Sequence, residues 1–280
     1  MIQKAFAYSR SLKLALPSAR TGFEGRSIGR RTGNALEFAE YRDYQPGDDI
    51  RRLDWGVYAR KEQLMVRQFN EEVDPRCDVV LDCSASMAIA SGSADEALGL
   101  AALLALAGEN AGFSLALWFA KEKWLQAEHP ERPQEWPDIS FDSSSSPGES
   151  IHAFPGGFHQ RGIRIVISDF LWPLPPMEFL HRICEGAQRC WLLRLEPFSL
   201  PRMEEHGAFA VTDAETGETR ECIWDEAMLA RYEARLHSHR DQWDHEAEKS
   251  GVALLDISRE ALADNLASAL LVRHGLLTAG

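Results

Sequence analysis

The sequence predicts an α/β fold: a doubly wound, mostly parallel sheet with a small N-terminal α+β appendage. Three observations support this. From residue 75 onward, short apolar runs alternate with longer helix-forming segments, which is typical of parallel strands with helices on both faces of a sheet. The apolar runs are continuous, as in strands buried on both faces. The preceding residues lack this alternation, so we expect two regions, 1–74 and 75–280.

The N-terminal region is expected to begin with a helix over residues 2–16, because apolar residues recur at helical spacing before Pro17. Four glycines interrupt the basic segment Thr21–Asn34, which favours a loop. This segment does not predict a nucleotide site, because no strand precedes it and no Gly-Lys-Ser/Thr ends it.

The second region contains the elements of the sheet in order. The predicted strands are residues 78–81, 113–120, 163–168, 190–195 and 252–256, and the predicted helices are residues 95–111, 176–186, 225–250 and 259–271. Residues 123–126 are expected to pair in a hairpin, and residues 128–148 are expected to form a loop of little intrinsic order. Residues 209–223 read as an inserted β-hairpin around a Gly-containing turn.

Composition excludes several classes of protein. A net charge of −13 and an isoelectric point near 5.2 argue against nucleic-acid or anionic-membrane binding. No apolar run approaches the roughly 20 residues of a membrane span, so no membrane insertion is expected. The five cysteines are scattered, without a Cys-x-x-Cys spacing, which favours reduced thiols in a cytoplasmic protein.

Two acids follow directly after predicted strands. Asp82 and Asp169 should meet at the carboxyl edge of the sheet, where open α/β sheets bind ligands. Ser84 and Ser86 add hydroxyls, and such an all-oxygen set suits Mg²⁺. The spacing fits equally well a turn closed by Asp82 with Ser84 or Ser86 capping the next helix. Both interpretations remain open at this point.

The segment Asp82-Cys83-Ser84-Ala85-Ser86 resembles the Asp-x-Ser-x-Ser motif of von Willebrand factor A domains, and residues 167–170 resemble the strand end that supplies their later Asp. The resemblance implies a metal-ion-dependent adhesion-type site that binds Mg²⁺, with Mn²⁺ or Ca²⁺ as alternatives. These domains usually supply a Thr from an intervening loop. The matching stretch here is Pro147–Ile151, in which Ser150 offers a hydroxyl and Glu149 a carboxylate.

The upstream segments are similar to the signature of the DUF58 family. The similar segments are residues 33–38, 41–51, 54–55 and 59–60. Because family members have no assigned catalytic activity and are often encoded beside MoxR-type AAA+ ATPases, the resemblance implies a non-catalytic adaptor that works with such an ATPase on an unknown client protein.

Residues 20–67 hold ten basic and eight acidic side chains, so this stretch is near +2 while the rest of the chain is near −15. The signature side chains form either an internal ion-pair network, which we favour, or a docking face for the ATPase. The candidate docking residues are Arg42, Asp48, Asp49, Arg51, Asp54, Trp55 and Arg60.

The sequence supports an enzyme less well than a non-catalytic adaptor. A metal-dependent hydrolase that uses Asp82 and Asp169 is the main alternative. A phosphoryl-transfer enzyme of the haloacid-dehalogenase type needs a second Asp where Ser84 stands, and the serine-hydrolase glycines are missing. Cys83 is expected as a packed thiol rather than a nucleophile. The helical set His237, Asp241 and His245 is expected on a solvated, charged face rather than around a metal.

Overall fold

The computed structural model describes residues 1–16, 36–45, 48–71, 75–89, 92–154, 156–173, 175–196 and 207–280. The chain divides into two compact units. The larger unit comprises Met1–Ser18 and Pro75–Gly280, and the smaller unit comprises Ala19–Asp74. The division expected at residue 74 grouped the first 18 residues with the smaller unit, whereas their contacts group them with the larger one.

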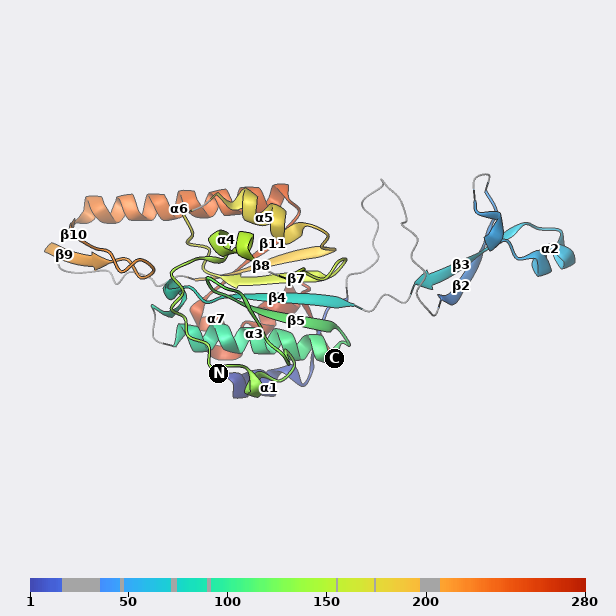
Figure 1. Cartoon of the computed structure of the whole chain (residues 1–280), viewed down its shortest axis with the longest axis horizontal. Helices are drawn as coiled ribbons and strands as arrows, with labels where there is room; N and C mark the ends of the chain where they lie inside the picture. The colour runs from blue at the N-terminus through green and yellow to red at the C-terminus, as the bar shows by residue number, and fades with distance from the viewer. Residues whose placement is uncertain are drawn as a thin grey trace. The chain divides into compact units, whose positions relative to one another are not determined.

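The larger unit is built on a six-stranded, mostly parallel sheet (Figure 1). In sheet order the strands are β11 (Ala253–Ile257), β8 (Arg189–Leu195), β7 (Ile163–Ser168), β4 (Arg76–Asp82), β5 (Ser114–Ala120) and β6 (Leu125–Gln126). Only β6 runs antiparallel, as the hairpin partner of β5. The five strands and the hairpin predicted for this sheet are confirmed within about two residues at their ends.

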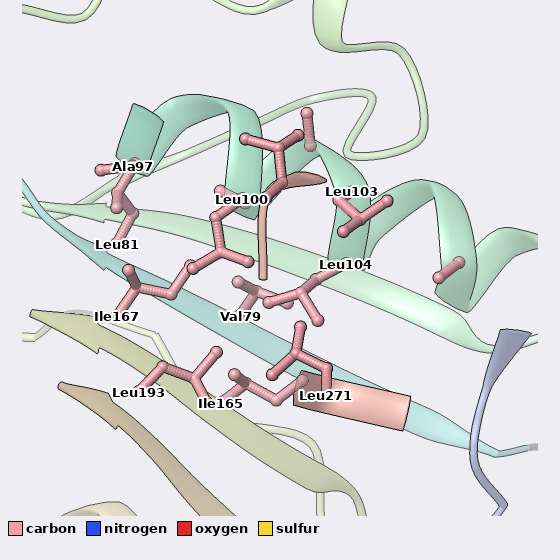
Figure 2. Packing of buried hydrophobic residues seen from close by; sticks show 14 of the residues in the cluster. Val79, Leu81, Ala97, Leu100, Leu103, Leu104, Ile165, Ile167, Leu193 and Leu271 are labelled. Carbon is pink, nitrogen blue, oxygen red and sulfur yellow. The ribbon is translucent and has the colours of Figure 1, made fainter. Parts of the chain in front are cut away.

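Helices cover both faces of this sheet, which confirms the α/β fold. One face packs against α3 (Ser93–Asn110), and Figure 2 shows its leucines directed at the side chains of the central strands. The other face packs against α5 (Pro176–Cys184) and α6 (Glu226–Lys249). Because both faces are covered, every residue of β7 is buried.

Strand β4 is the point at which the direction of winding reverses. The chain passes from β4 through α3 to β5 on one side, and then crosses to β7 on the other side. The connections leaving the carboxyl ends of β4 and β7 therefore diverge. Open α/β sheets bind ligands in the crevice that such a divergence leaves.

The N-terminal segment differs from the single helix expected over residues 2–16. Helix α1 (Ile2–Ser9) ends early, and β1 (Leu12–Leu14) pairs antiparallel with β12 (Leu277–Ala279). Leu12 and Leu14 are buried while Lys13 is exposed, a period-two pattern too short to recognise in the sequence. Pairing with the distant C-terminus decides the structure of this segment.

The prediction of a single C-terminal helix over residues 259–271 is also wrong in part. The segment consists of α7 (Arg259–Asn265) and α8 (Ser268–Arg273), separated by Leu266 and Ala267. Both of these residues have left-handed backbone, with φ of 54° and 57°, and both are fully buried. Burial of these apolar side chains offsets the backbone strain that the sequence pattern does not reveal.

The inserted hairpin is confirmed. It consists of β9 (Gly207–Thr212) and β10 (Thr219–Trp224), paired antiparallel in full register. Most residues of the two strands are exposed, and Trp224 at the end of β10 is buried. The hairpin therefore buries little of its own strands, and Trp224 packs where β10 leads into α6.

The smaller unit combines an antiparallel pair, β2 (Leu36–Asp43) and β3 (Met65–Glu71), with helix α2 (Trp55–Lys61). Asp54 caps α2 by accepting from the backbone N–H groups of Gly56 and Val57, and Tyr41 donates its hydroxyl to Asp54 Oδ2 at 2.7 Å. These elements match the expected α+β appendage. The predicted loop Thr21–Asn34 lies outside the described residues.

Candidate metal centre

Asp82 is the last residue of β4, and its side chain is completely buried. Its Oδ1 accepts from the Ser84 backbone N–H at 2.9 Å. Its Oδ2 accepts from the Ser168 hydroxyl at 2.6 Å and from the Trp172 indole N–H at 3.1 Å. These bonds fix the carboxylate at the point where the winding reverses. Because a carboxylate oxygen has two lone pairs, Oδ1 keeps one for a further ligand.

Ser84 directly precedes the short 3₁₀ helix η2 (Ala85–Ala88), and Ser86 lies within it. Their hydroxyl oxygens lie 3.1 Å apart. The turn expected at Asp82 is present, because Asp82 Oδ1 accepts from the Ser84 N–H, and Ser84 is the N-cap residue of η2. Its side chain makes no capping bond, and α3 begins after Gly92. The Ser84 and Ser86 hydroxyls therefore lie close to Asp82, and the Ser84 hydroxyl is not used in a capping bond.

Asp169 follows β7, the strand next to β4, and is 5% exposed. Its Oδ1 accepts from the Leu171 backbone N–H at 3.0 Å, and the Ser86 hydroxyl also hydrogen-bonds to its carboxyl. The next residue, Phe170, has a φ of 53°, which a bulky side chain rarely adopts. Such strain costs about 1–3 kcal/mol and concentrates at functional sites.

The two carboxyls are electrostatically unfavourable to each other as they stand. Burial and the charge of Asp169 raise the pKa of Asp82 to about 6. Burial likewise raises the pKa of Asp169, against smaller lowerings by the hydrogen bonds from Leu171 N–H and Ser86. Two buried carboxylates that repel each other gain from a bound cation, which would favour the ionised form of both.

We therefore expect a pH-dependent stability in the cation-free protein. Since the pKa of Asp82 is raised by folding, its contribution is fully present below about pH 4 and is lost as the pH rises through about 6. The unfolding free energy of the wild type, relative to Asp82→Asn, should fall by roughly 3 kcal/mol between pH 4 and pH 7. Urea titrations across this range measure it, and parallel curves would contradict the assignment.

Ser150 lies at the end of the one-turn helix α4 (Pro147–Ser150). Its hydroxyl donates to the Ser146 carbonyl at 3.0 Å and accepts from the Trp124 indole N–H at 2.9 Å. It is thus engaged in the core beneath α5 and α6 rather than in contact with Asp82. The structure brings together four of the five expected ligands and directs Ser150 elsewhere.

A different part of the expected loop lies beside the site. Ser143 forms a parallel bridge with Ser84: its N–H donates to the Cys83 carbonyl at 3.2 Å, and its carbonyl accepts from Ala85 N–H at 3.1 Å. The serine run at 143–146 therefore passes directly along the Asp82 turn. The run of four serines was the only feature of the sequence that could have pointed to this segment. Its position is fixed by the backbone hydrogen bonds with Cys83 and Ala85.

Sequence reasoning also missed Glu215, which lies in the turn of the β9–β10 hairpin and is half-buried. Burial and, to a smaller extent, the charges of Asp82 and Asp169 together raise the pKa of Glu215 to about 7. A residue more than 40 positions from either acid along the chain thus lies within electrostatic reach of both. No local sequence signal identifies this proximity.

The seven candidate docking residues of the smaller unit play two kinds of role. Asp48 pairs with Arg42 at 2.9 Å, while Asp49 accepts from the Arg51 backbone N–H and Asp54 caps α2. Among the described residues, one of the expected ion pairs, Arg42–Asp48, is therefore present, and Asp49 and Asp54 accept from the backbone instead. Arg51, Trp55 and Arg60 are exposed, with Trp55 at 59%, and Arg60 bonds to the Gly56 carbonyl at 3.0 Å.

The remaining candidates behave as structural residues. Cys83 is buried, and burial raises the pKa of its thiol. His237 and Asp241 face each other at 3.5 Å on the exposed side of α6. Within the described ranges, no three His, Cys, Asp or Glu side chains gather as a metal-binding group. A cation at the sheet edge would therefore rely on two carboxylates and on serine hydroxyls.

The fold and the site define an α/β protein with an oxygen-rich cluster at a strand end. Residues 40–133 match the family described as "Protein of unknown function DUF58", which supports the DUF58 resemblance of the sequence. The chain is also similar to the uncharacterized proteins Mb1516 of Mycobacterium bovis and Rv1480 of Mycobacterium tuberculosis. Each is 27% identical over 295 residues, covering 98% of this chain and 92% of the relative.

No helix among the described residues is long and apolar enough to cross a membrane.

Proposed function

We propose that this chain is a non-catalytic, cytoplasmic protein-binding adaptor whose larger unit is a von Willebrand factor A-like domain with a metal-ion-dependent adhesion-type site. The observation that supports it best is the convergence of Asp82, Asp169 and the Ser84–Ser86 hydroxyl pair where the winding of the sheet reverses. Asp82 Oδ1, the two hydroxyls and Asp169 would hold Mg²⁺, or Mn²⁺ or Ca²⁺ in its place. Such a cation keeps open positions that an oxygen of a partner protein can fill.

The proposed partner is a MoxR-type AAA+ ATPase, which acts with the chain on a client protein. This follows from the DUF58 resemblance, and the smaller unit offers a suitable surface. Trp55 and Tyr58 are 59% and 42% exposed and pack edge to face at 6.2 Å along α2. Arg51 and Arg60 are exposed nearby in the sequence. Trp, Tyr and Arg are the residues most enriched at the centres of protein interfaces.

Partner capture tests this surface. From lysate of a bacterium that encodes the chain, the wild-type protein should recover an AAA+ ATPase, and Trp55→Ala should reduce recovery about tenfold. Because Trp55 is exposed, its loss should leave the unfolding free energy within about 0.5 kcal/mol of the wild type.

Ile223→Ala is the matched control, because Ile223 is a 71% exposed apolar side chain in the larger unit. It should recover the ATPase normally. Capture without any AAA+ ATPase, or equal capture by Trp55→Ala, would count against the proposed partnership.

The alternative is a metal-dependent hydrolase, in which a cation at Asp82 and Asp169 activates water. The contacts favour binding over catalysis. Both lone pairs of Asp82 Oδ2 are used by Ser168 and Trp172, and the Ser84 and Ser86 hydroxyls bond to each other rather than to an imidazole. Cation-dependent turnover of esters or phosphates that Asp169→Asn abolishes would favour the hydrolase.

A further inference from the structure

Helix α6 contacts the turn that carries Asp169 through two side chains one helical turn apart. His239 Nε2 lies 2.7 Å from the Phe170 carbonyl oxygen, and the ring of Trp243 packs against the ring of Phe170 at 4.7 Å. Because a carbonyl oxygen can only accept, His239 donates this bond from Nε2–H, which is present in one neutral tautomer and in the imidazolium. The bond therefore does not require His239 to be charged.

The residue that accepts this bond has an unfavourable backbone conformation. Phe170 has a φ of 53°, in the left-handed region that a bulky side chain rarely adopts. Such a conformation persists only where the surrounding structure fixes it. The Phe170 backbone is held on both sides, because its N–H donates to the Ser168 hydroxyl at 2.8 Å and its carbonyl accepts from His239. Loss of the His239 bond should therefore let this backbone relax.

The backbone of Phe170 is linked to both acids of the candidate metal centre. The Ser168 hydroxyl, which accepts from Phe170 N–H, donates in turn to Asp82 Oδ2 at 2.6 Å. Asp169 directly precedes Phe170, and its Oδ1 accepts from the Leu171 N–H at 3.0 Å, so the carboxyl spans the strained residue. A change in the Phe170 backbone would therefore move the Asp169 carboxyl and disturb the Ser168 bond.

We propose that His239 is a positioning residue of the candidate metal centre: its bond to the Phe170 carbonyl holds the Asp169 turn in the conformation that binds a cation. This inference rests on the cation site of the proposed function. His239 acts through the backbone of the turn and not as a ligand. The placement of α6 is thereby part of the geometry of the site, as expected of the shell of contacts that holds a binding site in place.

Three substitutions at position 239 test the bond. His239→Gln keeps an N–H donor at about the reach of Nε2, whereas the amide of His239→Asn is one methylene shorter and His239→Ala has no donor. Calorimetric titration with Mn²⁺ should show binding about fivefold weaker in the Ala and Asn variants and near the wild-type value in the Gln variant. A purely structural contact would change stability without this pattern of affinities.

Hydrogen exchange in the cation-free protein is the second measurement. The amides of Phe170 and Leu171, which bond to Ser168 and Asp169, should exchange about fivefold faster in His239→Ala and His239→Asn than in the wild type. His239→Gln should keep the wild-type rates. Circular dichroism confirms that each variant is folded.

His237→Ala is the matched control on the same helix. His237 is largely exposed, and its Nε2 lies 3.5 Å from Asp241. This variant removes an imidazole from α6 and should leave both the Mn²⁺ affinity and the exchange rates unchanged.

The possible results distinguish the role of His239 from the proposed function. Wild-type Mn²⁺ affinity in His239→Ala overturns the positioning role alone. Equal losses in the Gln and Ala variants also overturn it, because they indicate that the charge of His239, which partly offsets the raising of the Asp169 pKa by burial, matters more than the bond. If Mn²⁺, Mg²⁺ and Ca²⁺ all fail to bind the wild type, the proposed function falls. Unchanged exchange rates in His239→Ala would then show that the bond does not hold the turn either.

Discussion

Asp82→Asn is expected to abolish the stabilisation of the protein by divalent cations. The substitution removes a charge and sets an amide N–H against one of the donors that now bond to the carboxylate. In the wild type, a ligand at 100 times its dissociation constant stabilises by about 2.7 kcal/mol. Thermal unfolding with millimolar Mg²⁺ or Mn²⁺ and with EDTA should show a shift of several degrees that the variant loses.

Asp241→Asn is the matched control, because Asp241 is an exposed carboxylate on α6 whose nearest ion-pair partner is His237. It removes the same charge and should leave the cation response unchanged. A cation shift that survives in Asp82→Asn would place the cation elsewhere on the chain. A wild type that shows no shift with any of the three cations would contradict the metal centre itself.

Trp243→Ala is expected to cause the largest loss of stability. Trp243 on α6 is 1% exposed and packs against Phe170, Trp172 and Phe179 at ring distances of 4.7, 5.4 and 6.3 Å. Removing a buried Trp costs about 3–5 kcal/mol through lost burial and the cavity that remains. Urea unfolding at pH 7 should show a clear drop in the midpoint.

Trp243→Ala should also weaken cation binding at the candidate metal centre. Phe170 follows Asp169, and Trp172 donates to Asp82, so the aromatic cluster around Trp243 positions both acids. Weaker cation binding in Trp243→Ala is therefore expected alongside the loss of stability. Trp243 Nε1–H is buried without an acceptor among the described residues, so Trp243→Phe should cost far less.

Trp55→Ala removes an equally large side chain from an exposed position and should change stability by no more than about 0.5 kcal/mol. Equal losses in Trp243→Ala and Trp55→Ala would contradict the packing described for α6.

The central sheet was predictable because its signals are local. An apolar run such as residues 163–168 must be buried on both faces, and a helix-forming segment must follow to cover it. The same reasoning located Asp82 and Asp169, since a polar residue directly after a buried strand lies at the sheet edge. The long helix α6 and the β9–β10 hairpin were predicted for comparable reasons.

The wrong predictions share one cause: each residue concerned contacts a segment that lies far away in the sequence. Leu12–Leu14 is a strand because Leu277–Ala279 lies beside it, and the helix expected to run to Leu271 breaks at Leu266 because that side chain is needed in the core. Ser150 was predicted as a ligand because it lies where von Willebrand factor A domains supply a Thr. In the structure its hydroxyl instead accepts a hydrogen bond from the indole of Trp124. Local pattern carries no information on these contacts.

The sequence by itself therefore determined the α/β class, the order of the strands along the chain, and the two acids and two serines of the candidate site, because each depends on neighbours within a few residues. Only the tertiary structure decided how this site is surrounded. It placed the Ser143 segment along the Asp82 turn and directed the Ser150 hydroxyl to Ser146 and Trp124. These placements depend on the packing of distant segments, which no short stretch of sequence encodes.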